Sequence, residues 1–254
     1  MTTITFNRQV LFAAVILFAA LISGCSSSTS TNTPPANANV TPKTGSTYTY
    51  AMFKDTAGTK VPGSDTTINA SVTADSQTML NQSNVYTVID GGDTTYLTYA
   101  SNKDVMIYRQ TTGLSGLFQS LGDGVFHRWI NLAITSKTSG VKILNDTDVI
   151  VTVQGFAIPA KVTVETDFIA DENVTVGTET MATNHCRITA TAVSNTAIIS
   201  PTVTYTNQRD IYFAPKIGYA AKVTTKESIP AITLLGSTAK VTGTSKTLTA
   251  YSIK

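Results

Sequence analysis

Residues that could carry out chemistry are few in this sequence, and none of them lies in a catalytic spacing. The two histidines, His127 and His185, are far apart and do not form the His-x-x-x-His pattern of a zinc site. Residues 113–116 include a serine but lack the Gly-x-Ser-x-Gly pattern of a nucleophile elbow. The sequence has no phosphate-binding loop and no dinucleotide fingerprint. We therefore predict no catalytic residue, no metal site and no cofactor.

Carboxylates offer two weaker alternatives. Asp90 with Asp93, and Asp146 with Asp148, have oxygen ligands of the kind that Ca²⁺ prefers, but short acidic segments more often form turns. Four further carboxylates could include an acid and base pair for a hydrolase of envelope glycans, although a solvated turn also accounts for them. These four are Glu165, Asp167, Asp171 and Glu172. The hydrolase is therefore the least favoured function.

Cys186 is the one thiol in the body of the chain, and its neighbour His185 invites comparison with a cysteine–histidine pair. On a β-strand, adjacent residues point to opposite faces, so this histidine cannot activate the thiol. Cys186 shares its expected face with Ile188 and Ala190. We predict a buried residue that behaves as a small hydrophobe.

The N-terminus combines a cation, Arg8, with an apolar run over residues 10–22 and then small residues. This order is that of a secretory signal, and the run is shorter than the roughly 20 residues of a membrane span. The segment Ile22-Ser23-Gly24-Cys25 resembles the lipobox of bacterial lipoproteins. The resemblance implies cleavage before Cys25 and attachment of acyl chains, such as palmitate, to that cysteine. The alternatives are a short signal anchor and an ordinary signal peptide followed by a chance cysteine.

Three segments follow from this interpretation. Residues 1–24 are the signal peptide, and residues 25–44 are a flexible tether rich in Ser, Thr, Pro and Asn. Residues 45–254 form a single domain. Ser26 after the lipidated cysteine resembles an outer-membrane sorting signal in a Gram-negative cell, with a periplasm-facing domain favoured. The sequence leaves inner and outer membrane open.

The composition limits the partners. The chain has 18 Lys and Arg residues against 16 Asp and Glu residues, a formal net charge of +2. This balance provides no basic field for nucleic acid, so we predict none as a partner. The expected partners are the membrane, through the lipid on Cys25, and a hydrophobic ligand or an envelope protein.

The sequence pattern predicts an all-β fold. Threonine, a good strand residue and a poor helix residue, occupies 46 of the 254 positions. From Ser46 onward, apolar and polar residues alternate with a period of two, and turn residues recur at short intervals. We expect an antiparallel meander that forms a curved sheet, half-barrel or barrel, with at most one or two short helical turns.

Several local features of this meander are predicted. Asp90-Gly91-Gly92-Asp93 indicates a hairpin, and residues 126–134 indicate a strand. Turns are expected at residues 146–148 and 171–173, and Pro159 indicates an edge or a bulge. The tyrosines of the N-terminal half can line a cavity or fill the sheet core. They are Tyr48, Tyr50, Tyr86, Tyr96, Tyr99 and Tyr108.

Residues 111–124 interrupt the alternation. Their apolar residues follow the i, i+3, i+4, i+7 spacing of a helical stripe, although nearby glycines argue against a long helix. The four residues of this stripe are Leu114, Leu117, Phe118 and Leu121. The segment is predicted either to plug one end of the core or to act as a lid over a ligand cavity.

The C-terminal half contains a strand that ends in two aromatic residues, then Ala214-Pro215-Lys216-Ile217-Gly218, then a strand rising to Lys222. This arrangement resembles uncharacterised all-β envelope lipoproteins of the curved-sheet type found in Lol lipoprotein carriers. The resemblance implies a sheet curled around a hydrophobic interior and carries no catalytic residues. From the residues alone, proline and glycine at this spacing predict a tight hairpin.

Three functions remain open. The first is a non-enzymatic, lipid-anchored envelope protein that binds a hydrophobic ligand or a partner protein on a curved sheet. The second is a structural or adhesive scaffold without a small-molecule ligand, which the nearly neutral, Thr-rich surface suggests. The third is the glycan hydrolase.

Overall fold

The computed structural model describes residues 39–109, 127–153, 156–196, 199–231, 236 and 238–254. The chain divides into two compact units, Met1–Pro35 and Ala36–Lys254. The first unit lies wholly outside the described residues, so every described residue belongs to the second. The signal peptide, Cys25 and the apolar stripe of Leu114, Leu117, Phe118 and Leu121 therefore lie outside the described residues.

The described part of the chain is built from β-strands and contains no helix, which confirms the all-β prediction. In chain order the strands are β1 Thr47–Thr56, β2 Thr59–Lys60, β3 Thr66–Met79, β4 Gln82–Asp90, β5 Asp93–Tyr99, β6 Val105–Arg109, β7 Ile130–Asn131, β8 Val141–Val153, β9 Phe156–Val176, β10 Glu179–Thr196, β11 Ile199–Ala214, β12 Tyr219–Ile229 and β13 Lys240–Ser252.

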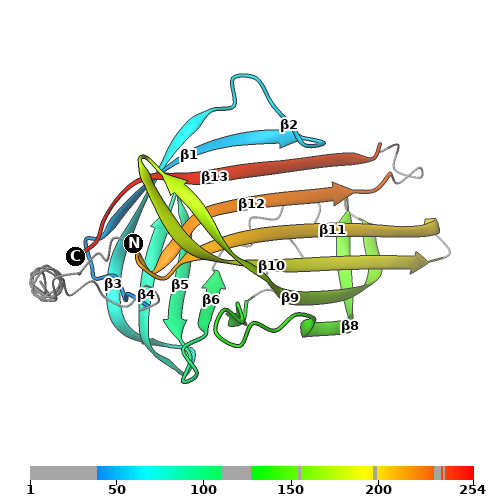
Figure 1. Cartoon of the computed structure of the whole chain (residues 1–254). Coiled ribbons are helices and arrows are strands. Elements are labelled where there is room, and N and C mark those ends of the chain that lie inside the picture. Colours follow the sequence, from blue (N-terminus) through cyan, green and yellow to red (C-terminus); the bar gives the residue numbers. More distant parts are fainter. Residues whose placement is uncertain (1–38, 110–126, 154–155, 197–198, 232–235, 237) are drawn as a thin grey trace, which may run out of the picture. The chain divides into compact units, whose positions relative to one another are not determined.

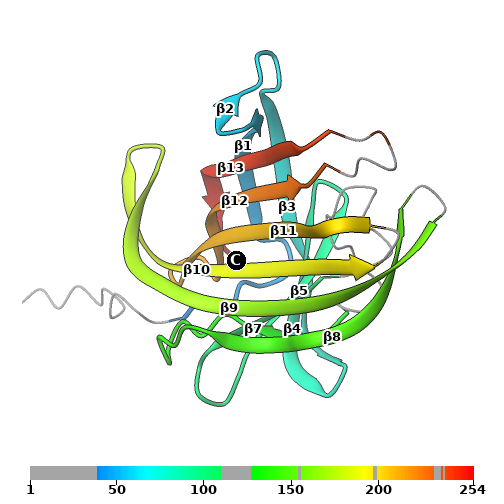
Figure 2. The ribbon, with the colours of Figure 1, turned by 90° about the vertical axis from the view of Figure 1, so that its right-hand side faces the viewer.

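All strands belong to one antiparallel sheet with the order β7-β6-β5-β4-β3-β1-β13-β12-β11-β10-β9-β8, and the short β2 pairs with β1. Two meanders run outward from the centre, where the first strand pairs with the last (Figure 1). The sheet curls until it is nearly closed into a barrel (Figure 2). About eight strands make a barrel that side chains just fill, so this wider sheet must be plugged or hold a cavity.

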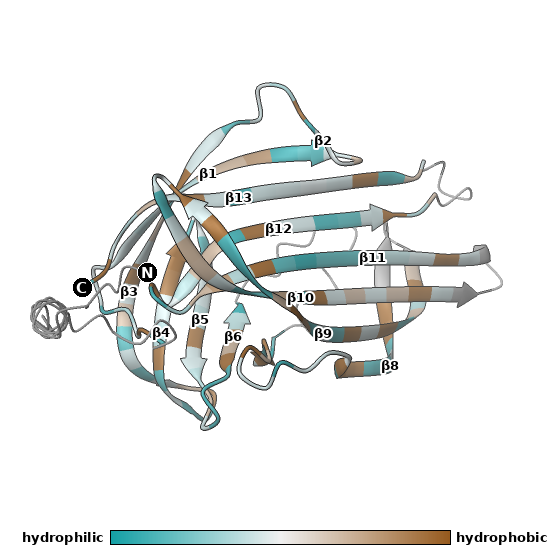
Figure 3. Cartoon of the chain, in the orientation of Figure 1, coloured by the Kyte–Doolittle hydropathy of each residue, from teal (hydrophilic) through white to brown (hydrophobic). Residues whose placement is uncertain are grey.

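The alternating sequence explains how this sheet acquires a buried face. On β1, Tyr48 and Tyr50 are buried, Thr49 between them is half-buried, and Thr47 and Ala51 on either side are exposed. Hydrophobic and hydrophilic residues interleave along most strands in the same way (Figure 3). Because side chains alternate across a strand, this pattern places one apolar set on the concave side.

The prediction of a strand over residues 126–134 is wrong in extent, because only Ile130–Asn131 form β7. After Asn131, side-chain oxygens take the place of a neighbouring strand as acceptors of backbone hydrogen bonds. Asp104 Oδ1 accepts hydrogen bonds from the backbone N–H groups of Thr135 and Ser136 at 2.5 and 3.2 Å. These long-range bonds satisfy two backbone N–H groups that a neighbouring strand would otherwise pair, and the chain then continues toward β8.

Two predicted acidic turns are also wrong. Residues 146–148 lie inside β8, where the register shifts between Leu144 and Thr147 and Asp146 has a φ of 46°. Residues 171–173 lie inside β9, which runs without interruption to Val176. Acidic residues continue these strands because the neighbouring strands and the chain before β8 supply partners, as Lys137 does for Asp171.

The prediction of an edge or a bulge at Pro159 holds only for the pairing with β10, because β9 is an interior strand that continues through Pro159 and pairs there with β8 without a register shift. The pairing of β9 with β10 begins at Lys161. In the described ladders, Pro159 pairs only with Ile150 of β8. A proline lacks the N–H that a second neighbouring strand would need. Ser194 Oγ donates instead to the Pro159 carbonyl at 2.9 Å.

Both predicted hairpins form. Asp90 pairs with Asp93 across the β4–β5 turn, and Ala214 pairs with Tyr219 across the β11–β12 turn. In the second turn Gly218 has a φ of +63°, and a Cβ there would lie 2.3 Å from the Val40 carbonyl oxygen. The position therefore requires glycine for both its backbone angle and its close approach to another segment.

The segment that approaches this turn precedes β1. The Val40 N–H donates to the Pro215 carbonyl at 2.9 Å, and Asn39 Nδ2 donates to the Lys103 carbonyl at 3.2 Å. These contacts lie on the N-terminal side of residue 45, where the sequence analysis began the domain.

Candidate functional site

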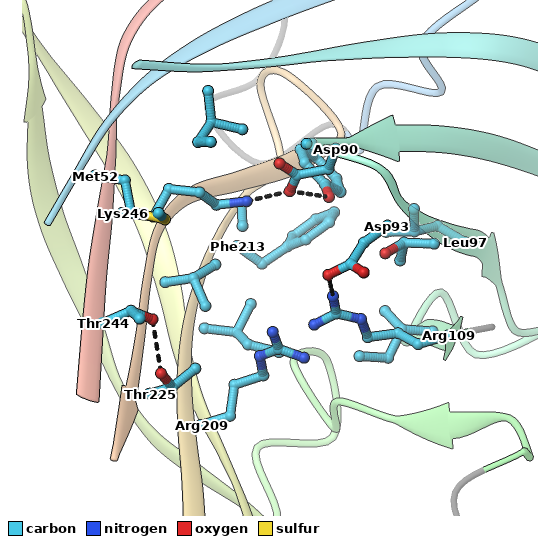
Figure 4. A pocket seen from close by; sticks show the side chains of 18 of the residues that line it. Met52, Asp90, Asp93, Leu97, Arg109, Arg209, Phe213, Thr225, Thr244 and Lys246 are labelled. Atoms are coloured by element: carbon cyan, nitrogen blue, oxygen red, sulfur yellow. Dashed lines mark hydrogen bonds and ion pairs between the residues drawn. The ribbon is translucent and has the colours of Figure 1, made fainter. Parts of the chain in front are cut away.

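A cavity of about 340 Å³ lies on the concave side of the sheet, between the strands around β5 and those around β12 (Figure 4). Its volume is at the lower end of the range of about 300–1,000 Å³ for small-molecule sites. Strands from both meanders contribute side chains, including Met52 of β1, Leu97 of β5, Ile107 and Arg109 of β6, Arg209, Ile211 and Phe213 of β11, Val223 and Thr225 of β12, and Thr244 and Lys246 of β13.

One end of the interior is closed by tyrosines whose hydroxyl groups bind the β11–β12 turn and the residues after it. Tyr48 Oη donates to the Ile217 carbonyl at 3.0 Å, and Tyr86 Oη donates to the Gly218 carbonyl at 2.6 Å. Tyr50 Oη donates to Ala220 O at 2.7 Å. We call Tyr48, Tyr50 and Tyr86 the tyrosine plug. Its members are almost fully buried, and burial is the main cause that raises the pKa of each.

Two further tyrosines extend this packing. Tyr99 Oη donates to the Val40 carbonyl at 2.7 Å, and burial raises the pKa of Tyr99 to about 12. Tyr219 packs against the ring of Tyr48 at 5.1 Å between centroids, and its hydroxyl reaches Asp90 Oδ2 at 3.2 Å. From the sequence, the tyrosines of the N-terminal half could line a cavity or fill the sheet core. The plug tyrosines belong to the core, and Tyr219 belongs to both.

A buried ion pair joins the tyrosine plug to the cavity. Lys246 Nζ binds Asp90 Oδ2, and their side chains are only 15% and 9% exposed. The same ammonium group lies 4.5 Å from the centroid of the Tyr50 ring. Burial lowers the pKa of Lys246, and the Asp90 carboxylate opposes that effect. The positive charge of Lys246 and the negative charge of Asp90 therefore neutralise each other within the cavity wall.

Two arginines lie farther toward the open side of the cavity. Arg109 Nη2 binds Asp93 Oδ2 at 2.8 Å, but its buried Nε has no hydrogen-bond partner. Arg209 forms neither an ion pair nor a hydrogen bond with any residue that the structure describes, and its side chain is half-buried. Figure 4 shows both guanidinium groups directed into the cavity from opposite walls.

The sequence analysis singled out Asp90 and Asp93 but missed the three cations of this cavity, although a signal exists for the two arginines. Arg209 alternates with Ile211 and Phe213 along β11, so the three side chains lie on the same face of that strand. Arg109 shares a face of β6 with Ile107 in the same way. A charge on the inward-facing parity of an otherwise apolar strand is costly unless it is paired or binds something. The two arginines are therefore recognisable from the sequence as charges on an apolar face, but only after the inward face of each strand is known.

Cys186 is fully buried, as predicted, and burial raises the pKa of its thiol to about 12. His185 does not face it. The imidazole stacks on the Tyr212 ring at 4.2 Å between centroids, and its nitrogens contact Glu172 at 2.7 Å and Asp210 at 2.9 Å. The thiol therefore lacks both the base and the access that a nucleophile needs.

Of the four candidate hydrolase carboxylates, Asp171 and Glu172 line a second cavity, whereas Glu165 and Asp167 do not. Glu172 binds His185, while Asp171 binds Lys137 at 2.5 Å and Asn184 at 2.8 Å. Asp167 accepts the Gly140 N–H at 2.7 Å, and Glu165 lies opposite Lys142 in the β8–β9 ladder. These four residues do not share one cavity wall. The geometry therefore favours ladder and surface partners over a paired acid and base.

The candidate calcium-binding aspartates have partners as well. Asp90 and Asp93 bind Lys246 and Arg109, and Asp148 binds Lys161 at 3.0 Å. Among the described residues, no three His, Cys, Asp or Glu side chains are grouped as metal ligands. Nor does the described part of the chain contain a helix with the length and hydrophobicity of a membrane span.

Comparisons with known proteins place the chain in no family. No family model matches it, and no curated protein matches it. Among solved structures it is similar to the hypothetical lipoprotein YmcC from Escherichia coli, with 12% identity over 98% of each chain and a TM-score of 0.31. A TM-score this low gives the likeness no weight for fold or function.

Proposed function

We propose that this protein is a non-enzymatic, lipid-anchored component of the cell envelope that binds a hydrophobic ligand inside its curved sheet. The observation that carries the proposal is the concave cavity of about 340 Å³, walled by apolar side chains from both meanders. Ligand sites are typically concave and mostly apolar, with a few polar groups that set orientation. The mouths and interiors of wide β-barrels are common places for such sites.

The anchoring part of the proposal rests on the lipobox-like segment that ends at Cys25. Several acyl chains on one cysteine would hold the protein stably on a bilayer, since each buried methylene contributes about 0.8 kcal/mol. In a Gram-negative source we place the anchor in the outer membrane, with the domain facing the periplasm. The tether would let the domain meet its ligand without a fixed orientation to the membrane.

Mass spectrometry of the full chain, extracted from its own membrane in a mild neutral detergent, tests both parts. We expect the denatured mass to match a chain that begins at Cys25 and carries acyl groups. We expect the native mass to exceed it by one small lipophilic molecule. Cys25→Ser should lose the acyl mass, whereas Cys186→Ser should keep it.

A variant that fills the cavity gives the matched control. Val223→Trp adds an aromatic side chain to the cavity wall, and Ile150→Trp adds the same group at an exposed position of β8. The first should lose the bound molecule while the second retains it. A native mass without any addition in the wild type would contradict ligand binding and favour the scaffold.

A further inference from the structure

The two arginines of the cavity form a site with more cationic donors than the protein satisfies. The cavity wall holds three cations, Arg109, Arg209 and Lys246, against two carboxylates, Asp90 and Asp93. Each carboxylate binds a different cation, which leaves Arg209 as the unpaired charge. The buried Nε of Arg109 adds a donor that finds no acceptor.

The register of the sheet shows why no protein group neutralises Arg209. It lies opposite Ile188 on β10 and opposite Thr225 on β12, so neither residue directly opposite it is a carboxylate. The nearest inward-facing carboxylate of β12, Glu227, accepts a hydrogen bond from the hydroxyl of Tyr205 at 2.6 Å. Across the cavity it faces Arg109, as Figure 4 shows. Two guanidinium groups that converge on a half-enclosed space repel each other, and an anion between them would remove that repulsion.

The chemistry of the donors limits the anion. Guanidinium groups present planar N–H pairs that match carboxylate and phosphate oxygens, and they remain charged at every physiological pH. Beside them on β11, Ile211 and Phe213 continue the wall as apolar surface. An oxyanion would therefore find its donors at one end of a pocket whose remaining wall favours hydrocarbon.

We propose that the cavity binds an anionic amphiphile, with its carboxylate or phosphate ester held between Arg109 and Arg209 and its apolar chain along Ile211 and Phe213. This inference rests on the proposed function and names the chemical class of its ligand. A cavity of about 340 Å³ lies at the lower end of the range for small-molecule sites. The site therefore suits a short or single chain, or one end of a longer lipid.

Titration calorimetry of the full-length chain in a neutral detergent, with a micelle-only blank, tests the assignment. The probes are octanoate, octyl phosphate, the neutral octanol and inorganic phosphate. We expect both anionic amphiphiles to bind at least tenfold more tightly than octanol, and inorganic phosphate to bind more weakly than octyl phosphate. The better of the two amphiphiles identifies the head group.

Arg209→Met tests the assigned residue, because it removes the charge and retains a chain of similar length. It should weaken the binding of octanoate or octyl phosphate about tenfold or more and leave octanol binding unchanged. The matched control is Arg187→Met on the neighbouring strand, whose side chain binds Asp210 outside the cavity. This variant should bind all probes as the wild type does.

The other outcomes separate this inference from the proposed function. Equal binding of octanoate and octanol, unaffected by Arg209→Met, would overturn the anionic class and leave a hydrophobic ligand in place. Tighter binding of inorganic phosphate than of octyl phosphate would overturn the amphiphile. Failure of all four probes would overturn the inference, and a bare native mass of the membrane-extracted chain would then reject the proposed function as well.

Discussion

The closed and open ends of the same interior treat their polar groups in opposite ways. At the closed end, the hydroxyls of Tyr48, Tyr50 and Tyr86 each donate to a backbone carbonyl within 3.0 Å. At the open end, Arg209 has no ion-pair partner among the described residues and the Nε of Arg109 has no acceptor. Satisfied buried groups stabilise a fold, whereas unsatisfied ones cost stability unless something else binds them.

The two ends are built from the same strands, so the contrast does not arise from different folds. Along β1 the inward positions pass from Tyr48 and Tyr50 in the plug to Met52 in the cavity. Along β12 they pass from Ala220 beside the plug to Val223 and Thr225 in the cavity wall. The same strands thus carry the tyrosine plug and the cavity wall, and different side chains distinguish the two regions.

The largest effect is expected where the plug meets the chain before β1. Gly218→Ala would force a Cβ against the Val40 carbonyl oxygen and impose a φ of +63° on alanine. Left-handed backbone costs roughly 1–2 kcal/mol, and displacing Val40 breaks further hydrogen bonds, so we expect unfolding free energy to fall by about 3 kcal/mol. Urea unfolding would measure it. Gly63→Ala has a φ of +71° with open space around it and should lose only the backbone cost.

A smaller loss is expected from a single hydroxyl of the plug. Tyr86→Phe leaves the Gly218 carbonyl without its buried donor, which should reduce unfolding free energy by roughly 1–3 kcal/mol. Thermal or urea unfolding would report the change. The control is Tyr212→Phe, because the Tyr212 hydroxyl makes no hydrogen bond within the described residues and should be dispensable. Equal losses from both variants would show that the plug hydroxyls contribute nothing specific.

The smallest change in stability is expected at the open end. Without ligand, Arg209→Met should leave unfolding free energy unchanged or raise it by up to about 1 kcal/mol, because it removes a charge that the protein does not pair. Arg187→Met should lower stability, since it takes one cation from the largely buried Asp210 carboxylate. Denaturant titrations of ligand-free protein would compare the two. A clear loss from Arg209→Met would mean that Arg209 serves the fold, and the contrast between the ends would disappear.

Local sequence patterns were sufficient to predict the hairpins whose turns contain glycine, proline or aspartate at characteristic spacings. The Asp90-Gly91-Gly92-Asp93 turn and the Pro215–Gly218 spacing each predicted a hairpin that the structure contains. Local patterns failed where acidic residues continue a strand, as at Asp171, because their partners come from other segments. They failed again after Asn131, where Asp104, distant in sequence, provides the acceptors.

The candidate site was out of reach of the same reasoning. Its ion pair joins Asp90 to Lys246 across 156 positions of sequence, and its two arginines meet from β6 and β11. Which parity of β12 faces the cavity also depends on a register shift between Tyr212 and Phe213 of β11. A shift of one residue moves a whole set of side chains to the other face.

The sequence by itself determined the all-β class, the antiparallel meander and the burial of Cys186, because alternation and turn residues act over a few positions. The tertiary structure decided that β1 pairs with β13, that tyrosines close one end of the interior, and that two arginines face each other at the other. Those arrangements depend on contacts between distant strands, whose register is set by the closure of the sheet as a whole.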